Sequence, residues 1–261
     1  MSEFCTADEL MTVAAARMLR DKAVCFVGIG LPSTAANLAR LTHAPNAVLV
    51  YESGPIGAKP PVLPLSIGDG DLADTADTVV STPEIFRYWL QGGRVDVGFL
   101  GAAQLDRYAN INTTVIGPYE KPKVRLPGAG GAPEISSSAK EVLIVVKQSK
   151  RTFVEKLDFI TSVGFLAGGT SREDAGLAGK GPVAVITDLC VLRPAPESRE
   201  LRVASIHPGV DRATIAANTG WMIQFAEACE QTSMPTAEEL AVLRDLKART
   251  AAAHGAEGEA A

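Results

Sequence analysis

The segment Glu52-Ser53-Gly54 holds the residues of this chain that are best suited to chemistry. Residues 47–51 before it form an apolar run typical of a short buried strand, and the prolines and glycines of residues 54–64 are typical of a loop. In open α/β folds, ligands bind where parallel strands end, at the carboxyl edge of the sheet. A carboxylate at that edge can act as a nucleophile or general base, although it can also simply hold a loop. We predict that Glu52 is the catalytic residue.

Two glycines follow another predicted strand. Gly28 and Gly30 lie between an apolar strand at 23–27 and a helix at about 32–41. Glycine lets the backbone come close to a ligand, and the free N–H groups at the start of a helix favour negative charge. An ordinary tight turn is the alternative explanation.

Small residues also characterise two later segments. Gly101-Ala102-Ala103-Gln104 follows a buried strand at 95–100, and the stretch 127–133 is the most glycine-dense of the chain. Close packing of helices on strands is the alternative explanation for the first of them. We expect these segments to meet Glu52 at one edge of the sheet, around a large ligand with a negatively charged end.

Several familiar motifs are incomplete, which argues against the chemistry that they support. Ser33 stands where a dinucleotide fingerprint has its third glycine, and the glycine-dense stretch lacks the Gly-Lys-Ser/Thr ending of a P-loop. Gly-x-Ser-x-Gly is absent, so a serine hydrolase is not indicated. The acidic residues of 67–71 lack the downstream glutamate of a calcium loop, so we expect a solvated loop there.

Charge and composition restrict the partners and the location. The net charge of −5 argues against nucleic acid or an anionic membrane as the main partner. No apolar run approaches the roughly 20 residues of a membrane span, and the N-terminus lacks the features of a signal peptide, so we expect a cytoplasmic protein. The four cysteines and three histidines form no ligand-spaced cluster. We expect no metal, buried and reduced cysteines, and a structural role for His207.

Alternating strands and helices predict an α/β fold, with an open mixed or parallel sheet and flanking helices on both faces. The chain of 261 residues is long enough for one large domain, which we place at 1–250, and its 46% hydrophobic and 5% aromatic content indicates an aliphatic core. The residues 251–261, rich in Ala, Gly and Glu, are expected to form a disordered tail.

Some elements can be placed more closely. Thr6 and Glu9 predict a capping box for a first helix, and Thr82 is expected to cap a later one. Residues 110–116 alternate between polar and apolar, which predicts a half-exposed strand. Residues 183–192 predict a strand, a turn and a second strand.

Four motifs in order resemble the β subunit of class I coenzyme A (CoA)-transferases, most closely the glutaconate CoA-transferase branch. They cover roughly residues 5–225 and are Gly28-Ile29-Gly30-Leu31-Pro32, Glu52-Ser53-Gly54, Gly101-Ala102-Ala103-Gln104-Leu105-Asp106 with Asn110-Ile111-Asn112-Thr113-Thr114, and Gly128-Ala129-Gly130-Gly131-Ala132, with Thr187-Asp188 as support. The resemblance implies a mixed α/β fold and a homologous α subunit outside this chain, in an α2β2 heterotetramer. It implies no cofactor other than the CoA of the substrate.

The resemblance also places Glu52 at the catalytic glutamate of the family. There, the carboxylate attacks a thioester carbonyl, and the resulting acyl-glutamyl anhydride accepts CoA to give an enzyme thioester. Backbone N–H groups of the glycine segments are expected to bind the oxyanion and CoA. The expected residues are Gly28, Gly30, Gly101, Ala102, Gln104, Gly128, Gly130, Gly131 and Ala132.

Further residues are weaker candidates for the substrate. Ser53, Asn110 and Asn112 are candidates for binding the substrate, where the two amides could bind a carboxylate; for both asparagines we favour the alternative, which is that they hold a turn. A basic segment is a candidate for binding the CoA phosphates, with a solvated loop as the alternative: Lys121, Lys123 and Arg125.

Residues 51–60 and 119–127 are similar to one subgroup of the family, from steroid-degrading bacteria, that opens the last steroid ring by hydrolysis. This resemblance implies a cyclic β-keto acyl-CoA substrate from steroid (cholesterol) catabolism, a retro-Claisen cleavage, and Glu52 as general base. We predict this hydrolytic ring opening as the activity. The alternatives are CoA transfer between an acyl-CoA and a carboxylate through a glutamyl-CoA thioester, and a non-catalytic partner subunit.

Overall fold

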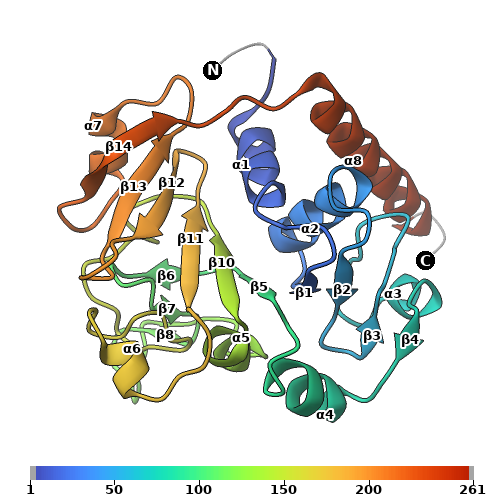
Figure 1. Ribbon diagram of the computed structural model, residues 1–261, viewed down its shortest axis with the longest axis horizontal. Coiled ribbons are helices and arrows are strands. Elements are labelled where there is room, and N and C mark those ends of the chain that lie inside the picture. The colour runs from blue at the N-terminus through green and yellow to red at the C-terminus, as the bar shows by residue number, and fades with distance from the viewer. Residues whose placement is uncertain (1–3, 259–261) are drawn as a thin grey trace.

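A ten-stranded sheet runs through the molecule (Figure 1). The computed structural model describes residues 4–258. Five neighbouring strands in the middle of the sheet run parallel, in the order β11-β10-β5-β1-β2, so their carboxyl ends lie at one edge. These strands are β1 (Val24–Phe26), β2 (Val48–Val50), β5 (Val97–Leu100), β10 (Glu141–Val145) and β11 (Pro182–Ile186).

Further strands extend the sheet on both sides. Beyond β11, the antiparallel strand β12 is followed by β13 and β14, and beyond β2 the short strands β3 and β4 pair antiparallel. Two small antiparallel sheets pair β6 with β7 and β8 with β9. The bounds are β3 (Pro55–Ile56), β4 (Thr78–Val79), β6 (Gln104–Leu105), β7 (Ile111–Asn112), β8 (Val115–Ile116), β9 (Val124–Arg125), β12 (Cys190–Pro194), β13 (Leu201–Ile206) and β14 (Gln224–Gln231).

Helices cover both faces of the sheet. The helices α1, α2 and α8 share one apolar core, and the π-helical turn η1 and α5 share the core on the other face. The helical bounds are α1 (Ala7–Ala16), α2 (Leu31–Leu41), α3 (Gly70–Asp74), α4 (Thr82–Glu84), η1 (Ile85–Leu90), α5 (Ala132–Ser138), α6 (Ser171–Asp174), α7 (Arg212–Ala217) and α8 (Ala237–Gly258). Within residues 4–258 no helix has the length and apolar character needed to span a membrane.

The predicted α/β class is confirmed, and so are most of the predicted elements. Thr6 and Glu9 form the capping box of α1, in which each side chain bonds the backbone N–H of the other residue. The pattern at 183–192 is the β11–β12 hairpin. The four cysteines are free thiols, and burial raises the pKa of Cys25 and raises that of Cys190 to about 12, so both thiols stay protonated at neutral pH.

Three predictions about local structure need correction. Ser81 rather than Thr82 precedes the helix, because the capping box pairs Ser81 with Glu84. Residues 110–116 do not form one half-exposed strand, because they split into β7 and β8, and both residues of β7 are buried. Residues 251–258 continue α8 where a disordered tail was expected; the rest of that tail, 259–261, lies outside the described residues.

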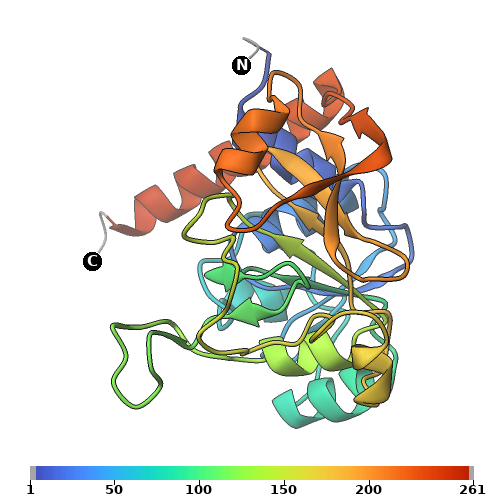
Figure 2. The same cartoon turned by 90° about the vertical axis from the view of Figure 1, so that its left-hand side faces the viewer.

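A loop between β8 and β9 projects from the body of the molecule (Figure 2, green). Tyr119 at its tip is 52% exposed and stacks on Phe159, with 5.6 Å between the ring centroids. The Arg125 guanidinium lies 5.3 Å from the centroid of the Tyr119 ring, a cation–π distance. The candidate basic residues Lys121, Lys123 and Arg125 all lie on this loop or at its end, so their predicted contact with CoA phosphates stays a prediction.

A buried arginine joins α6 to the helix α5. Arg172 is only 1% exposed, and its guanidinium donates hydrogen bonds of 2.8–2.9 Å to the carbonyl oxygens of Gly164, Ser136 and Ala178. Burial lowers the pKa of this guanidinium. Because Ser136 belongs to α5, the arginine helps to fix the helix that begins beside the candidate site described below.

Replacing Arg172 with methionine is expected to lower the free energy of unfolding by about 3 kcal/mol or more, because the carbonyl groups of Gly164 and Ser136, both buried, and the part-buried carbonyl group of Ala178 lose their donor. Denaturant unfolding of the purified protein measures this loss. The matched control is Arg151→Met, at an exposed arginine, which should change the value by less than about 0.5 kcal/mol. Equal effects of the two variants would contradict the structural role of Arg172.

Candidate active site

The candidate site lies beside β1, where the order of the parallel strands in the sheet reverses. From β1 the chain adds β2 on one side, and it later returns to add β5 on the other side of β1. A crevice forms at the carboxyl edge of an open α/β sheet where the strand order reverses in this way. Gly28 follows β1, Gly101 follows β5 and Glu52 follows β2, so three of the four predicted segments leave neighbouring strands at this point.

Glu52 lies at the tip of the tight turn that joins β2 to β3. The Tyr51 carbonyl oxygen accepts a hydrogen bond of 3.0 Å from the Gly54 N–H, which leaves Glu52 and Ser53 as the two central residues. Gly54 has a φ of +122°, and a Cβ there would collide with the Val80 carbonyl oxygen, so the turn requires glycine. Glu52 is half-buried and Ser53 is exposed.

The Glu52 side chain points toward the face of the sheet covered by η1 and α5. Tyr51 belongs to the core on the opposite face, where the Asn37 amide donates a hydrogen bond of 3.5 Å to the Tyr51 hydroxyl. A Cβ added to Gly131, the residue before α5, would lie 3.1 Å from Glu52 Oε2 and 2.8 Å from Phe86 Cζ. The fourth predicted segment, 128–132, therefore contacts the carboxylate as expected.

Five glycines around the site leave open space in front of the backbone. A Cβ at any of them would meet no atom within 4 Å: Gly28, Gly30, Gly101, Gly128 and Gly130. Gly28 and Gly101 also lack a positive φ, so neither packing nor backbone conformation requires glycine there. The open space is compatible with close approach of a ligand to the main chain, which stays a prediction for these glycines. Ala102 and Ala132 are half-buried and pack against the core around Val50 and Ile135.

Three polar residues predicted at the site are instead committed to the structure. Asn110 and Asn112 are fully buried, and Gln104 is 9% exposed. The Asn110 amide bonds Asp106 Oδ2, the Leu166 carbonyl and the N–H groups of Gly164 and Leu166. The Asn112 amide bonds Gln104 Oε1, the Val115 carbonyl and the N–H groups of Thr114 and Val115. Both asparagines hold turns, so the prediction that they bind substrate is corrected.

Phe86 is the site residue that sequence reasoning missed. In the sequence it lies in the helix expected after Thr82, together with the apolar residues Ile85, Trp89 and Leu90, and nothing marks it as a site residue. The structure places its ring beside Glu52 and Gly131 and 6.0 Å, centroid to centroid, from the ring of Phe26. No local pattern signals this contact, because it depends on how η1 and α5 pack together.

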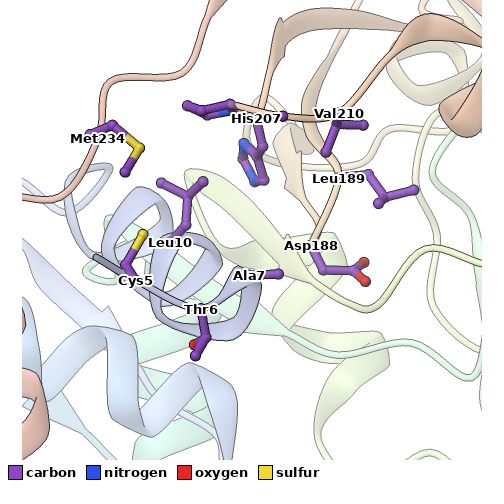
Figure 3. A pocket seen from close by; sticks show the side chains of 11 residues that line it. Cys5, Thr6, Ala7, Leu10, Asp188, Leu189, His207, Val210 and Met234 are labelled. Atoms are coloured by element: carbon purple, nitrogen blue, oxygen red, sulfur yellow. The ribbon is translucent and has the colours of Figure 1, made fainter. Parts of the chain in front are cut away.

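A separate cavity of about 490 Å³ lies further along the same edge (Figure 3). Asp188 and His207, which follow β11 and β13, line it together with Leu10 of α1. Three strands, β10, β5 and β1, separate β11 from β2. His207 is 1% exposed; its Nε2 donates to the Thr187 carbonyl at 2.8 Å, and its Nδ1 lies 2.9 Å from the Thr232 hydroxyl. These contacts agree with the structural role predicted for His207.

Burial lowers the pKa of His207 below its ordinary value. The unfolded chain binds a proton at this histidine near pH 6.5, whereas the folded chain does so only at lower pH, so stability falls as the pH drops below about 6.5. His207→Gln is expected to reduce this pH dependence by up to ~1.4 kcal/mol per pH unit. Denaturant unfolding at several pH values between about 7 and 5 measures the slope.

His43 provides the control for this prediction, because it is exposed. His43→Gln should keep the wild-type slope. If His207→Gln also keeps it, the buried neutral imidazole is not the source of the pH dependence.

A half-buried carboxylate at the switch point of an open α/β sheet, beside open glycine backbone, is an arrangement suited to covalent or acid–base chemistry. Residues 9–218 match the model of the coenzyme A transferase family, and the chain belongs to that family. The predicted family resemblance is thereby confirmed.

Three related proteins show how similar the chain is to known members. It is 70% identical over 258 residues, 99% of each chain, to the B subunit of the 3-oxoadipate CoA-transferase of Pseudomonas knackmussii. It is 33% identical over 233 residues, 86% of each chain, to the B subunit of the glutaconate CoA-transferase of Acidaminococcus fermentans. The crystal structure of that transferase superposes with a TM-score of 0.86 and 29% identity, covering 92% of this chain and 94% of the other. The cholesterol ring-cleaving hydrolase IpdB subunit of Mycobacterium tuberculosis is 27% identical over 241 residues, 92% of this chain and 93% of the other.

Proposed function

We propose that this chain is the β subunit of a CoA-transferase that moves CoA from an acyl-CoA to a short dicarboxylate of the 3-oxoadipate type, through a thioester on Glu52. The observation that carries the proposal is the position of Glu52, half-buried at the switch point between open glycine backbones. The 70% identity to a chain of a 3-oxoadipate CoA-transferase supports transfer as the reaction.

The geometry suits a carboxylate nucleophile. Glu52 attacks the acyl-CoA carbonyl and expels the CoA thiolate, which leaves an acyl-glutamyl anhydride. The thiolate then attacks the glutamyl carbonyl of the anhydride, giving the Glu52 thioester and releasing the first carboxylate. The acceptor carboxylate attacks this thioester, and the same two steps in reverse deliver acyl-CoA and restore Glu52. We assign the stabilisation of each tetrahedral oxyanion to backbone N–H groups near Gly28, Gly30 and Gly131.

The proposal includes a homologous α subunit, because the relatives named above are themselves single subunits of larger enzymes. We propose an α2β2 assembly in which the α subunit closes the open side of the site. No further cofactor is needed, because the substrate brings the CoA. We assign the binding of the extended CoA chain to Gly28 and Gly101, which is supported by their ordinary φ and the open space in front of them.

Hydrolytic opening of a steroid ring, predicted from residues 51–60 and 119–127, has weaker support. The ring-cleaving hydrolase subunit is 27% identical to this chain, whereas the 3-oxoadipate transferase subunit is 70% identical. Glu52 serves either reaction, as nucleophile in transfer or as general base in hydrolysis. The two reactions differ in whether Glu52 forms a covalent adduct with CoA: transfer requires the adduct and hydrolysis by a general base does not.

Mass spectrometry of the co-expressed α/β pair tests the proposal. With succinyl-CoA as the probe and no acceptor, the β subunit should gain the mass of CoA less one water at Glu52, and hydroxylamine should remove CoA and leave a hydroxamate. Adding 3-oxoadipate should discharge the adduct and form 3-oxoadipyl-CoA. Absence of the adduct, with solvent ¹⁸O entering the product of a cyclic acyl-CoA, would overturn transfer in favour of ring opening.

A further inference from the structure

We propose that the ring of Phe86 is the wall that keeps water from the Glu52 thioester, and so decides whether the bound CoA is transferred or lost by hydrolysis. This inference rests on the proposed transferase function and assigns to Phe86 a role that the family comparison does not give it. It concerns the fate of the intermediate and not its formation.

The geometry brings the ring and the reacting carboxylate to the same small space beside Gly131. One point in space, where a Cβ of Gly131 would lie, is 2.8 Å from Phe86 Cζ, 3.1 Å from Phe86 Cε1 and 3.1 Å from Glu52 Oε2. The absence of a side chain at Gly131 lets the ring and the carboxylate share this space. Gly131 itself is buried, so on this side the carboxylate faces the aromatic ring and main chain.

Phe86 belongs to the π-helical turn η1, where it packs against the edge of the core and stays only partly buried. The Gln91 N–H bonds the Phe86 carbonyl at 2.8 Å, five residues back, which is the π-helical pattern. Such turns are rare and are frequent at functional sites. Ile85 and Leu90 of the same turn are fully buried and anchor it, whereas Phe86 is only partly buried. The tilted contact with Phe26, at 51° between the ring planes, holds the ring in place.

The chemistry makes water exclusion necessary. In transfer, the acceptor carboxylate oxygen bonds to the glutamyl carbonyl carbon and the C–S bond breaks, releasing thiolate that is captured again. In hydrolysis, a water oxygen bonds to the same carbon and the C–S bond breaks. This returns the Glu52 carboxylate and free CoA thiol, with one proton going to the thiolate and one to solvent. Both reactions attack one atom, so an apolar ring beside it disfavours water while a bound acceptor is held in position.

The test compares transfer with hydrolysis in the co-expressed α/β pair. Succinyl-CoA is the donor, 3-oxoadipate the acceptor, and free CoA thiol released without an acceptor reports hydrolysis. Phe86→Ala and the conservative Phe86→Leu are measured beside Leu90→Ala. This control shortens a fully buried apolar side chain of the same turn.

The ratio of hydrolysis to transfer should rise at least tenfold in Phe86→Ala and less in Phe86→Leu, and it should stay at the wild-type value in Leu90→Ala. A structural role alone would lower both rates together and leave the ratio unchanged. If wild type forms the Glu52 thioester and the ratio in both Phe86 variants equals that of wild type, this inference is overturned while the transferase proposal stands. If wild type forms no thioester, the transferase proposal itself fails.

Discussion

Glu52→Gln is expected to lower turnover of acyl-CoA by the α/β pair on the order of 10⁴-fold or more, because the neutral amide cannot attack the thioester. Among the described residues, the Glu52 carboxylate makes no hydrogen bond or ion pair, so the amide should fit the turn without loss of stability. Turnover at saturating succinyl-CoA and the thermal unfolding midpoint measure the two effects separately.

The control for this variant is Glu197→Gln, at an exposed glutamate in the connection between β12 and β13, which should turn over like wild type. Turnover of Glu52→Gln within tenfold of wild type would assign the chemistry to the α subunit. The chain would then be the non-catalytic partner that was one of the sequence-based alternatives.

Gly131→Ala is expected to lower kcat/KM by about 100-fold, because displacing a reacting group by about 1 Å costs this much. The new methyl group would meet Phe86 Cζ at 2.8 Å and Glu52 Oε2 at 3.1 Å, so the ring or the carboxylate must move. The φ of −82° suits alanine, so the effect is steric and not conformational. Overpacking of this kind lowers the free energy of unfolding by about 1–3 kcal/mol. Steady-state kinetics and denaturant unfolding measure both quantities.

The matched control is Gly70→Ala, where a Cβ meets no atom within 4 Å and the φ is not positive, so activity and stability should match wild type. Combining Gly131→Ala with Phe86→Leu removes the ring atoms nearest to the methyl group and should restore part of kcat/KM. Wild-type kinetics in Gly131→Ala would show that Glu52 and Phe86 do not share this space in the working enzyme.

The position of Glu52 could be predicted because its signals are local. An apolar run, an isolated acid and a helix-breaking loop follow one another within about 15 residues, and the parallel-strand rule assigns an edge to such a site. The positions of Gly28, Gly30 and Gly101 could be predicted in the same way, because each glycine also follows the carboxyl end of a predicted strand. The order of the strands was not predictable in this way, because it depends on pairing between segments far apart in the chain.

The environment of the carboxylate could not be predicted, because Glu52, Phe86 and Gly131 come from three separate elements. The prediction that two polar residues bind the substrate was wrong because hydrogen bonds within the fold occupy their side chains. Asn110 and Asn112 have the chemistry of ligand-binding amides, but the turns between β6, β7 and β8 contain backbone groups that need the same hydrogen bonds. Burial, which the sequence does not state, decides between the two roles.

A π-helical turn contains one residue more than an α-helical turn. Deleting one residue between Phe86 and Leu90 would restore an ordinary α-helix and rotate the residues on either side relative to each other by roughly 100°. A lineage could thus gain or lose the aromatic ring at the carboxylate through the insertion or deletion of a single codon. Under the role proposed for Phe86, a one-residue gap at this position in an alignment of relatives predicts members with a higher ratio of hydrolysis to transfer.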